Sequence, residues 1–217
     1  RFFLLLVLLS GKLIAAPPPV KMTGGIIYAI PEWFKISFLD IKEDLSEATS
    51  HSRQLLLFFH LDECPYCARA LDENFREGDT KEWLEKNFDV IELNIRGGRP
   101  VTWLDGKSYT EVTLRNMLGI YATPTMLFIG SEGDIVLRLD GFRKRQTFRY
   151  VIDFVVQKAY RSMSLSDYIA KQKQTVYQFR AEPMFQERTD FKDYRKPLAV
   201  IFEDSYCSDC EEFHDKV

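Results

Sequence analysis

Residues 55–67 read LLLFFHLDECPYC, and this stretch decides the fold. Its first half, Leu55 to His60, is a continuous apolar run of strand length, which is typical of a strand covered on both faces in a βαβ arrangement. After a short connection, Cys64-Pro65-Tyr66-Cys67 stands where a following helix begins. Pro65 suits a first helical turn, because its missing amide hydrogen has no partner there in any case. The stretch therefore predicts a buried strand that leads into a C-x-x-C pair at the start of a helix.

The position of the two cysteines predicts different chemistry for each of them. At a helix start, unpaired N–H groups and the helix dipole favour a thiolate, so Cys64 is expected to be an acidified and exposed attacking group. Cys67 lies one helical turn deeper and is expected to be shielded. Such a pair can form and break a disulfide, with Cys67 as the resolving thiol.

A second C-x-x-C unit, Cys207 and Cys210, uses the two remaining cysteines and is a second possible redox pair. A zinc site would need both units to meet in space, but zinc ribbons usually separate such pairs by roughly 12–20 residues, and here a domain-sized stretch lies between them. A purely structural bridge within one unit would close too small a loop to remove much chain entropy. Redox chemistry therefore leads, and neither a metal nor a cofactor is expected.

The first sixteen residues differ in character from the rest of the chain. A basic Arg1, a short apolar run and small residues before Pro17 are typical of a secretory signal peptide, so residues 1–16 are predicted to be cleaved and the protein to be exported to the periplasm. A retained membrane anchor is the alternative. After cleavage no stable membrane insertion is expected, and residues 17–34 would form an N-terminal extension.

The rest of the chain continues an alternation of helices and strands. The formal net charge of −3 comes with no long Lys/Arg block, which argues against nucleic acid as a partner. The pattern predicts a mixed sheet flanked by helices, with helices over 40–50, 64–75, 81–87, 110–118 and 148–156, strands over 55–60 and 89–95, and a hairpin over 126–139.

Several of these motifs together resemble the thioredoxin fold. Phe59, the C-P-Y-C unit, Thr123-Pro124-Thr125, the Gly133 turn and Gly141 occur in the order of that fold. The stretch between Asn94 and Pro124 carries an insertion and is similar to the SoxW-like exported thioredoxins. The resemblance spans residues 35–160 and implies an α/β thioredoxin fold, with a central mixed sheet flanked by helices.

The same resemblance implies an exported thiol–disulfide oxidoreductase. Cys64 would be the nucleophile and Cys67 the resolving thiol. Pro124 would be a cis proline, beside which Thr123 pairs with an extended substrate segment, and Pro65 and Tyr66 would complete the substrate surface. The implied substrates are protein thiols and disulfides. The Pro65-Tyr66 dipeptide leaves both reduction and oxidation open as the direction of exchange, and reduction is the expected one, with a membrane electron donor as a partner. The alternative is a non-catalytic scaffold that holds client peptides at the Pro124 groove.

The chain also departs from ordinary thioredoxins at the site. Glu63 precedes Cys64 where thioredoxins carry Trp, and Phe58 aligns with their buried proton-accepting acid. Either Glu63 or His60 could take over that proton transfer. The competing interpretation is a solvated Glu63 and a locally hydrogen-bonded His60.

An internal repeat extends the prediction towards the C-terminus. Residues 198–207 match residues 55–64, so a second thioredoxin-like unit is expected to start near Lys196 and to be truncated over 196–217. Residues 161–195 would then form a helical segment and a linker. A basic cluster at 143–145 is expected to be a solvated helix start, with docking of an acidic partner as the alternative.

Overall fold

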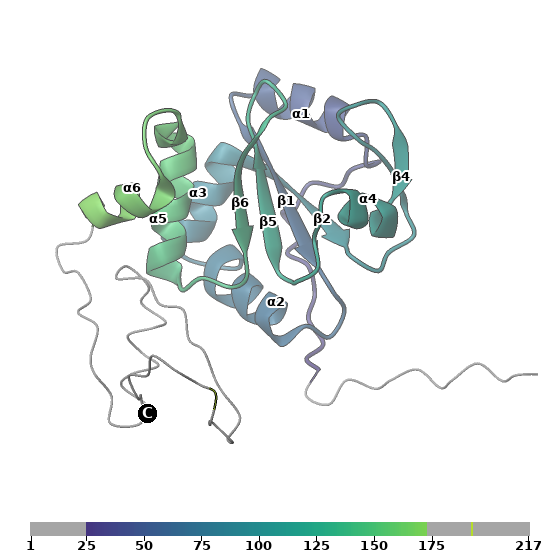
Figure 1. The fold of residues 1–217 in the computed structure, drawn as a ribbon, viewed down its shortest axis with the longest axis horizontal. Coiled ribbons are helices and arrows are strands. Elements are labelled where there is room, and N and C mark those ends of the chain that lie inside the picture. Colours follow the sequence, from purple (N-terminus) through teal and green to yellow (C-terminus); the bar gives the residue numbers. More distant parts are fainter. Residues whose placement is uncertain (1–24, 173–191, 193–217) are drawn as a thin grey trace, which may run out of the picture.

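The computed structural model describes residues 25–172 and Lys192, and a four-stranded sheet lies at its centre (Figure 1). The strand order is β2-β1-β5-β6, with β1 and β2 parallel and both other pairings antiparallel. The predicted mixed sheet is confirmed. Its strands are β1 (Gln54–His60), β2 (Phe88–Asn94), β5 (Thr125–Ile129) and β6 (Ile135–Asp140).

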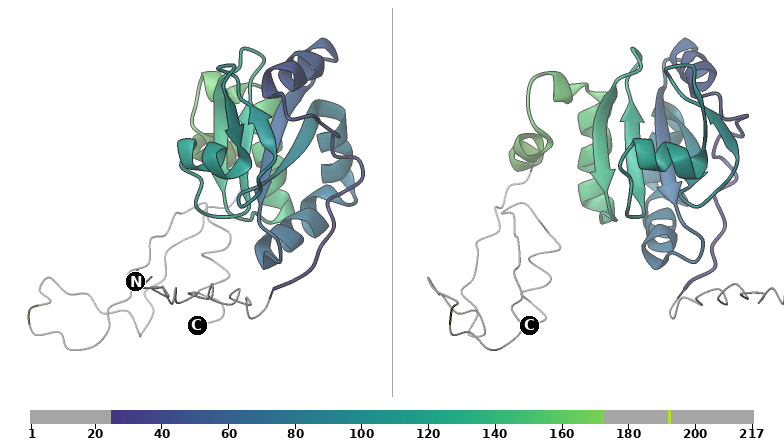
Figure 2. Two further views of the ribbon diagram at one scale, coloured as in Figure 1. Left: turned by 90° about the vertical axis from the view of Figure 1, so that its right-hand side faces the viewer. Right: turned by 45° about the vertical axis from the view of Figure 1, so that its right-hand side comes forward.

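Helices cover both faces of this sheet, and α1 and α2 lie at opposite ends of it (Figures 1 and 2). The right-hand view of Figure 2 shows α4 in front of the sheet. The helical elements are α1 (Ile41–Ser50), α2 (Pro65–Ala70), a π-helix (Leu71–Phe75), α3 (Asp79–Asn87), α4 (Glu111–Met117), α5 (Arg145–Val156), a 3-10 turn (Ala159–Arg161) and α6 (Leu165–Gln172). Every helix predicted up to residue 156 is present.

Strand β1 divides the core in two, because successive side chains of a strand point to opposite faces. Leu56 and Phe58 pack on the side of α2, α3 and α5, whereas Leu55, Leu57 and Phe59 pack on the side of α1 and α4. All five side chains are fully buried. The continuous apolar run therefore reflects two hydrophobic cores that meet at one strand.

The helix that carries the cysteines changes form after its first turns. The sequence predicts one helix through Phe75, but the chain passes from α-helix to π-helix at Leu71. The wider turn keeps Leu71 and Phe75 buried, and Phe75 packs edge-on against Phe58 with ring centroids 5.4 Å apart. Packing against the sheet thus sets the helix geometry here.

The segment before α1 belongs to the packed body of the protein. Phe34 is buried in the core, and the indole of Trp33 donates a hydrogen bond of 2.7 Å to the carbonyl of Phe75. The Tyr28 ring lies edge-on to His60, at the end of β1. The N-terminal extension therefore reaches the end of the sheet from which the cysteine helix starts.

A short hairpin that the sequence does not predict occupies the insertion before α4. It consists of β3 (Pro100–Thr102) and β4 (Ser108–Thr110), paired antiparallel. The Glu111 side chain is 1% exposed and accepts hydrogen bonds from the backbone N–H of Asn94 and of Arg99. One buried carboxylate therefore holds the two ends of the insertion together.

The basic cluster at 143–145 stands at a helix start, as predicted. Lys144 is the N-cap of α5, and Arg145 donates a hydrogen bond of 2.7 Å to the carbonyl of Glu73. The predicted signal peptide, the linker after residue 172 and the second unit with Cys207 and Cys210 lie outside the described residues. Within residues 25–172, no helix combines the length and apolar character needed to cross a membrane.

Candidate active site

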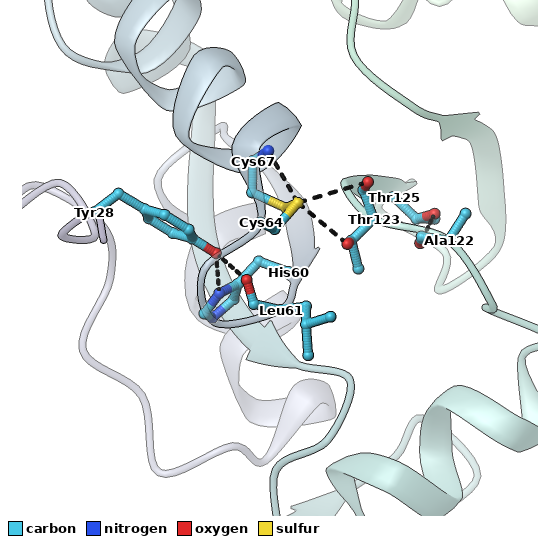
Figure 3. Close-up of a disulfide and its surroundings, with 8 residues drawn as sticks. All are labelled: Tyr28, His60, Leu61, Cys64, Cys67, Ala122, Thr123 and Thr125. Atoms are coloured by element: carbon cyan, nitrogen blue, oxygen red, sulfur yellow. Dashed lines mark hydrogen bonds between the residues drawn. A yellow bond between two sulfur atoms is a disulfide. The ribbon is translucent and has the colours of Figure 1, made fainter. Parts of the chain in front are cut away.

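The two cysteines of the C-P-Y-C unit form a disulfide at the start of α2 (Figure 3). Their Cα atoms are 5.2 Å apart, within the ordinary range for such a bond. Cys64 is the N-cap residue of α2, and its Sγ accepts a hydrogen bond of 3.1 Å from the backbone N–H of Cys67. Once the pair is reduced, the same N–H can stabilise a Cys64 thiolate.

The loop before β5 faces the disulfide from the other side of the site. The Thr123–Pro124 peptide bond is cis, as predicted. The Thr123 hydroxyl donates a hydrogen bond of 3.3 Å to Cys64 Sγ, and the Thr123 carbonyl oxygen lies 3.8 Å from the same sulfur (Figure 3). The structure thus brings together Cys64, Cys67, Thr123 and Pro124, which are far apart in the sequence.

The prediction that Cys64 is exposed is wrong, because the structure buries its side chain. Cys64 is only 6% exposed and Cys67 is fully buried, so the order of exposure holds but the difference is small. The cause is the contact with Thr123, which covers the outer sulfur. The outer sulfur is therefore covered by the Thr123 loop in the disulfide form.

Two exposed aromatic side chains belong to the two chain segments that form the site. Tyr66, in the first turn of α2, is 61% exposed, and Tyr121, in the loop that ends at the cis proline, is 75% exposed. Pro65 is exposed as well. The sequence predicts Pro65 and Tyr66 as substrate contacts, and both side chains are available for that role.

The cis-proline loop is held from β6 by an arginine. The Arg138 guanidinium donates hydrogen bonds to the carbonyls of Leu118 and Gly119, at 2.9 and 3.0 Å, and pairs with Asp140. Asp140 in turn accepts a hydrogen bond of 2.8 Å from the Thr125 hydroxyl. These bonds fix both ends of the loop that carries Thr123.

An aromatic ring lies at the position where the resemblance predicts the buried acid of thioredoxins. Phe58 is fully buried in the same cluster as Cys64 and Cys67. Glu63 is exposed, with a left-handed backbone at φ 58°, whereas His60 is 6% exposed. His60, and not Glu63, is therefore the residue that the fold encloses.

His60 belongs to a chain of polar contacts that sequence reasoning missed. Its Nε2 lies 2.8 Å from Glu92 Oε2, and its Nδ1 lies 2.9 Å from the Tyr28 hydroxyl. Arg99 pairs with Glu92 at 2.7 Å and with Glu111 at 2.6 Å. The one available signal is Glu92 itself, an acid within the apolar strand β2.

The contacts of this chain alter the acidity of its members. Burial alone would raise the pKa of Glu92, but hydrogen bonds from His60 and Arg99 outweigh it and hold that pKa below its ordinary value. Burial, with the nearby charges of Asp62 and Glu92, raises the pKa of Tyr28 well above its usual range. Glu92 is therefore a carboxylate and Tyr28 a neutral hydroxyl at neutral pH.

Residues 25–172 contain no group of three or more His, Cys, Asp or Glu side chains that could hold a metal ion. The polar groups at the site are instead arranged around a disulfide. A C-x-x-C disulfide at a helix start, opposite a cis-proline loop on a mixed four-stranded sheet, defines a thioredoxin-fold protein. Fold and cysteine pair together indicate thiol–disulfide oxidoreductase activity in general terms.

Comparison with protein families agrees with this class. The family described as thioredoxin-like domain matches residues 41–156, more than half of the 217-residue chain. The chain belongs to this family. No curated protein matches it.

Solved structures with a similar fold come from several bacteria. A thioredoxin-fold protein from Helicobacter pylori is 18% identical in sequence, with a TM-score of 0.48. The match covers 56% of this chain and 84% of the Helicobacter pylori chain. A thioredoxin from Thermus thermophilus is 25% identical in sequence, with a TM-score of 0.42. That match covers 54% of this chain and 83% of the Thermus thermophilus chain.

Proposed function

We propose that this protein is an exported thiol–disulfide oxidoreductase that reduces disulfides in protein substrates. The observation that carries the proposal is the contact between Cys64 Sγ and Thr123, which sets the outer sulfur of a helix-start disulfide against a cis-proline loop. In the disulfide form the Cys67 N–H and the Thr123 hydroxyl both donate to this sulfur, and in the reduced protein the same two groups would donate to the Cys64 thiolate. Both favour the thiolate, which is the attacking form.

The reaction is an exchange of bonds between sulfurs. The Cys64 thiolate attacks one sulfur of a substrate disulfide, a bond forms between these two sulfurs, and the other substrate sulfur leaves as a thiolate. Cys67 then loses its proton and attacks Cys64 Sγ. The Cys64–Cys67 disulfide forms, the second substrate thiolate departs, and two electrons have passed to the substrate.

The direction and the location belong to the same proposal. Each reductive turnover leaves the protein oxidised, so a reductant must restore it, and the proposal assigns this role to a membrane electron donor. The apolar, signal-like residues 1–16 support export to the periplasm. Fusion of these residues to alkaline phosphatase, which folds only where disulfides form, tests the export: activity is expected, and a cytoplasmic inactive fusion would contradict it.

Reduction of insulin disulfides by the full chain tests the catalytic proposal. We expect the wild type to be active and Cys64→Ser to be inactive. The matched control is Cys207→Ser with Cys210→Ser, which removes the other C-x-x-C unit and should leave the reduction by Cys64 intact. Equal rates for the wild type and Cys64→Ser would rule out catalysis by this pair.

The low exposure of Cys64 favours one second candidate, a binding module in which the disulfide is a static bridge. Such a module would hold an extended client peptide along the Thr123 backbone, in the manner of strand addition. Its signature would be equal peptide affinity for the oxidised protein and Cys64→Ser, together with no insulin reduction by either.

A further inference from the structure

The hydrogen bonds around His60 assign its protonation state. The Tyr28 hydroxyl has one hydrogen to donate but lies within reach of two acceptors, the Leu61 carbonyl at 2.6 Å and His60 Nδ1 at 2.9 Å. The shorter contact takes that hydrogen, because a carbonyl oxygen can only accept. His60 Nδ1 must then carry a hydrogen of its own and donate it to the Tyr28 oxygen.

The other ring nitrogen is fixed by a carboxylate. Glu92 Oε2 lies 2.8 Å from His60 Nε2, and Arg99 pairs with the other carboxylate oxygen at 2.7 Å. An ionised carboxylate is only an acceptor, so His60 Nε2 carries a hydrogen as well. With both nitrogens protonated, His60 is an imidazolium cation.

This cation stands at the base of the active-site loop. Figure 3 shows the imidazole and the Tyr28 hydroxyl beside Leu61, where the chain leads into Cys64. The Leu61 carbonyl accepts two hydrogen bonds, one from Tyr28 and one of 3.2 Å from the backbone N–H of Cys64. The state of His60 is thereby coupled to the turn that sets the position of Cys64.

We propose that His60 is a positioning residue that tunes the Cys64–Cys67 pair through its second proton. When both ring nitrogens are protonated, His60 carries a positive charge beside the loop that leads to Cys64, and the Tyr28 hydroxyl donates its hydrogen bond to the Leu61 carbonyl. When His60 loses that proton, the Tyr28 hydroxyl must turn to Nδ1, and the carbonyl keeps only the Cys64 N–H. The proposal rests on the thiol–disulfide exchange proposed above and names its regulation by pH.

Groups from several elements bear on His60. Glu92 approaches from β2, Tyr28 from the N-terminal segment, and Arg99 acts through Glu92 from the insertion. Asp62 lies near enough to Tyr28 to affect it, and the Phe58 ring stacks on the imidazole at a centroid distance of 6.2 Å. The imidazolium therefore lies beside the Tyr28 hydroxyl, which reaches the Leu61 carbonyl at the start of the loop that leads to Cys64.

The first experiment needs no substitution that could unfold the protein. In the full chain labelled with ¹⁵N, long-range ¹H–¹⁵N correlations report how many ring nitrogens of each of the 3 histidines carry hydrogen. For oxidised protein at pH 7 we expect both nitrogens of His60 to be protonated. A single protonated nitrogen would overturn the proposal.

The second experiment measures the cysteine. In a Cys207→Ser, Cys210→Ser background, the rate of Cys64 alkylation by iodoacetamide is followed against pH. Loss of a neighbouring positive charge destabilises a thiolate, so His60→Gln is expected to raise the midpoint and to slow alkylation about tenfold below it. His51→Gln, at the exposed end of α1, is the matched control and should leave the midpoint unchanged.

A second variant keeps the test decisive if His60→Gln fails to fold. Glu92→Gln removes the partner that fixes the second proton, so it should shift the midpoint in the same direction, and the two shifts should not add. An unchanged midpoint in the folded variants would overturn the proposal. These readouts do not use a substrate, so absence of insulin reduction would refute the proposed function and leave the result for His60 standing on its own.

Discussion

The Thr123 hydroxyl donates a hydrogen bond of 3.3 Å to the Sγ of Cys64, so the residue before the cis proline touches the sulfur that is predicted to attack. This contact covers the Cys64 sulfur in the oxidised form, and in the reduced form the same hydroxyl would donate a hydrogen bond to the Cys64 thiolate. One side chain therefore governs both access to Cys64 and the stability of its thiolate.

The first prediction concerns that hydroxyl. In Thr123→Val the Cys64 thiolate loses a donor while the shape of the side chain is kept, so we expect the midpoint of thiolate formation to rise by about one pH unit. The measurement is the absorbance of the thiolate near 240 nm during a pH titration of the reduced protein. Thr123→Ser keeps the hydroxyl and should titrate like the wild type; a midpoint that is the same in all three proteins would contradict the prediction.

The second prediction concerns the arginine that holds the same loop. Arg138→Lys keeps the positive charge, but a lysine ammonium lacks the planar pair of N–H groups that donates to the carbonyls of Leu118 and Gly119 at the same time. A looser loop should misplace Thr123 and slow insulin reduction roughly three- to tenfold. Arg161→Lys is the matched control, because its 3.6 Å pair with Glu132 is exposed. Equal slowing in both variants would show that the loop contacts are not responsible.

The parts of this fold that follow from the sequence are those set by neighbouring residues. Leu55 to Phe59 are apolar at every position because β1 is covered on both faces, and that pattern alone locates the strand. The C-P-Y-C unit and Thr123-Pro124 are short motifs whose order fixes the two sides of the site. The linear pattern was therefore sufficient for the sheet and the cysteines.

The parts that escaped prediction depend on distant partners. Tyr28 and Glu92 meet His60 from opposite directions along the chain, and neither shows in its own surroundings that it does so. The hairpin of β3 and β4 is too short for a strand pattern and is held by Glu111, which also lies far from Asn94 in the sequence. Cys64 is less exposed than expected because Thr123 covers it, a contact that only the folded loop creates.

The third prediction is a pH dependence of stability that originates at Glu92. Contacts with His60 and Arg99 lower its pKa in the folded state below the ordinary value of 4.5. A carboxylate with a depressed folded pKa contributes stability above its unfolded pKa, and this contribution is lost as the pH falls through the folded pKa. Urea unfolding between pH 7 and pH 3 should therefore show a steeper loss for the wild type than for Glu92→Gln. Parallel curves would contradict the assignment.

The last prediction concerns Glu111, which closes the insertion. Its carboxylate is 1% exposed and accepts hydrogen bonds from the backbone of Asn94 and Arg99 and from the Arg99 guanidinium. Glu111→Gln replaces one acceptor oxygen with a donor that faces these N–H groups, so we expect a loss of about 2 kcal/mol in the free energy of unfolding in urea. Glu132→Gln, on an exposed turn, should leave it unchanged. In Glu111→Gln the Arg99 guanidinium still pairs with Glu92, so the contacts of Glu92 with His60 are kept. We therefore expect folded Glu111→Gln to reduce insulin. A complete loss of that activity would show that the insertion acts on the cysteines directly.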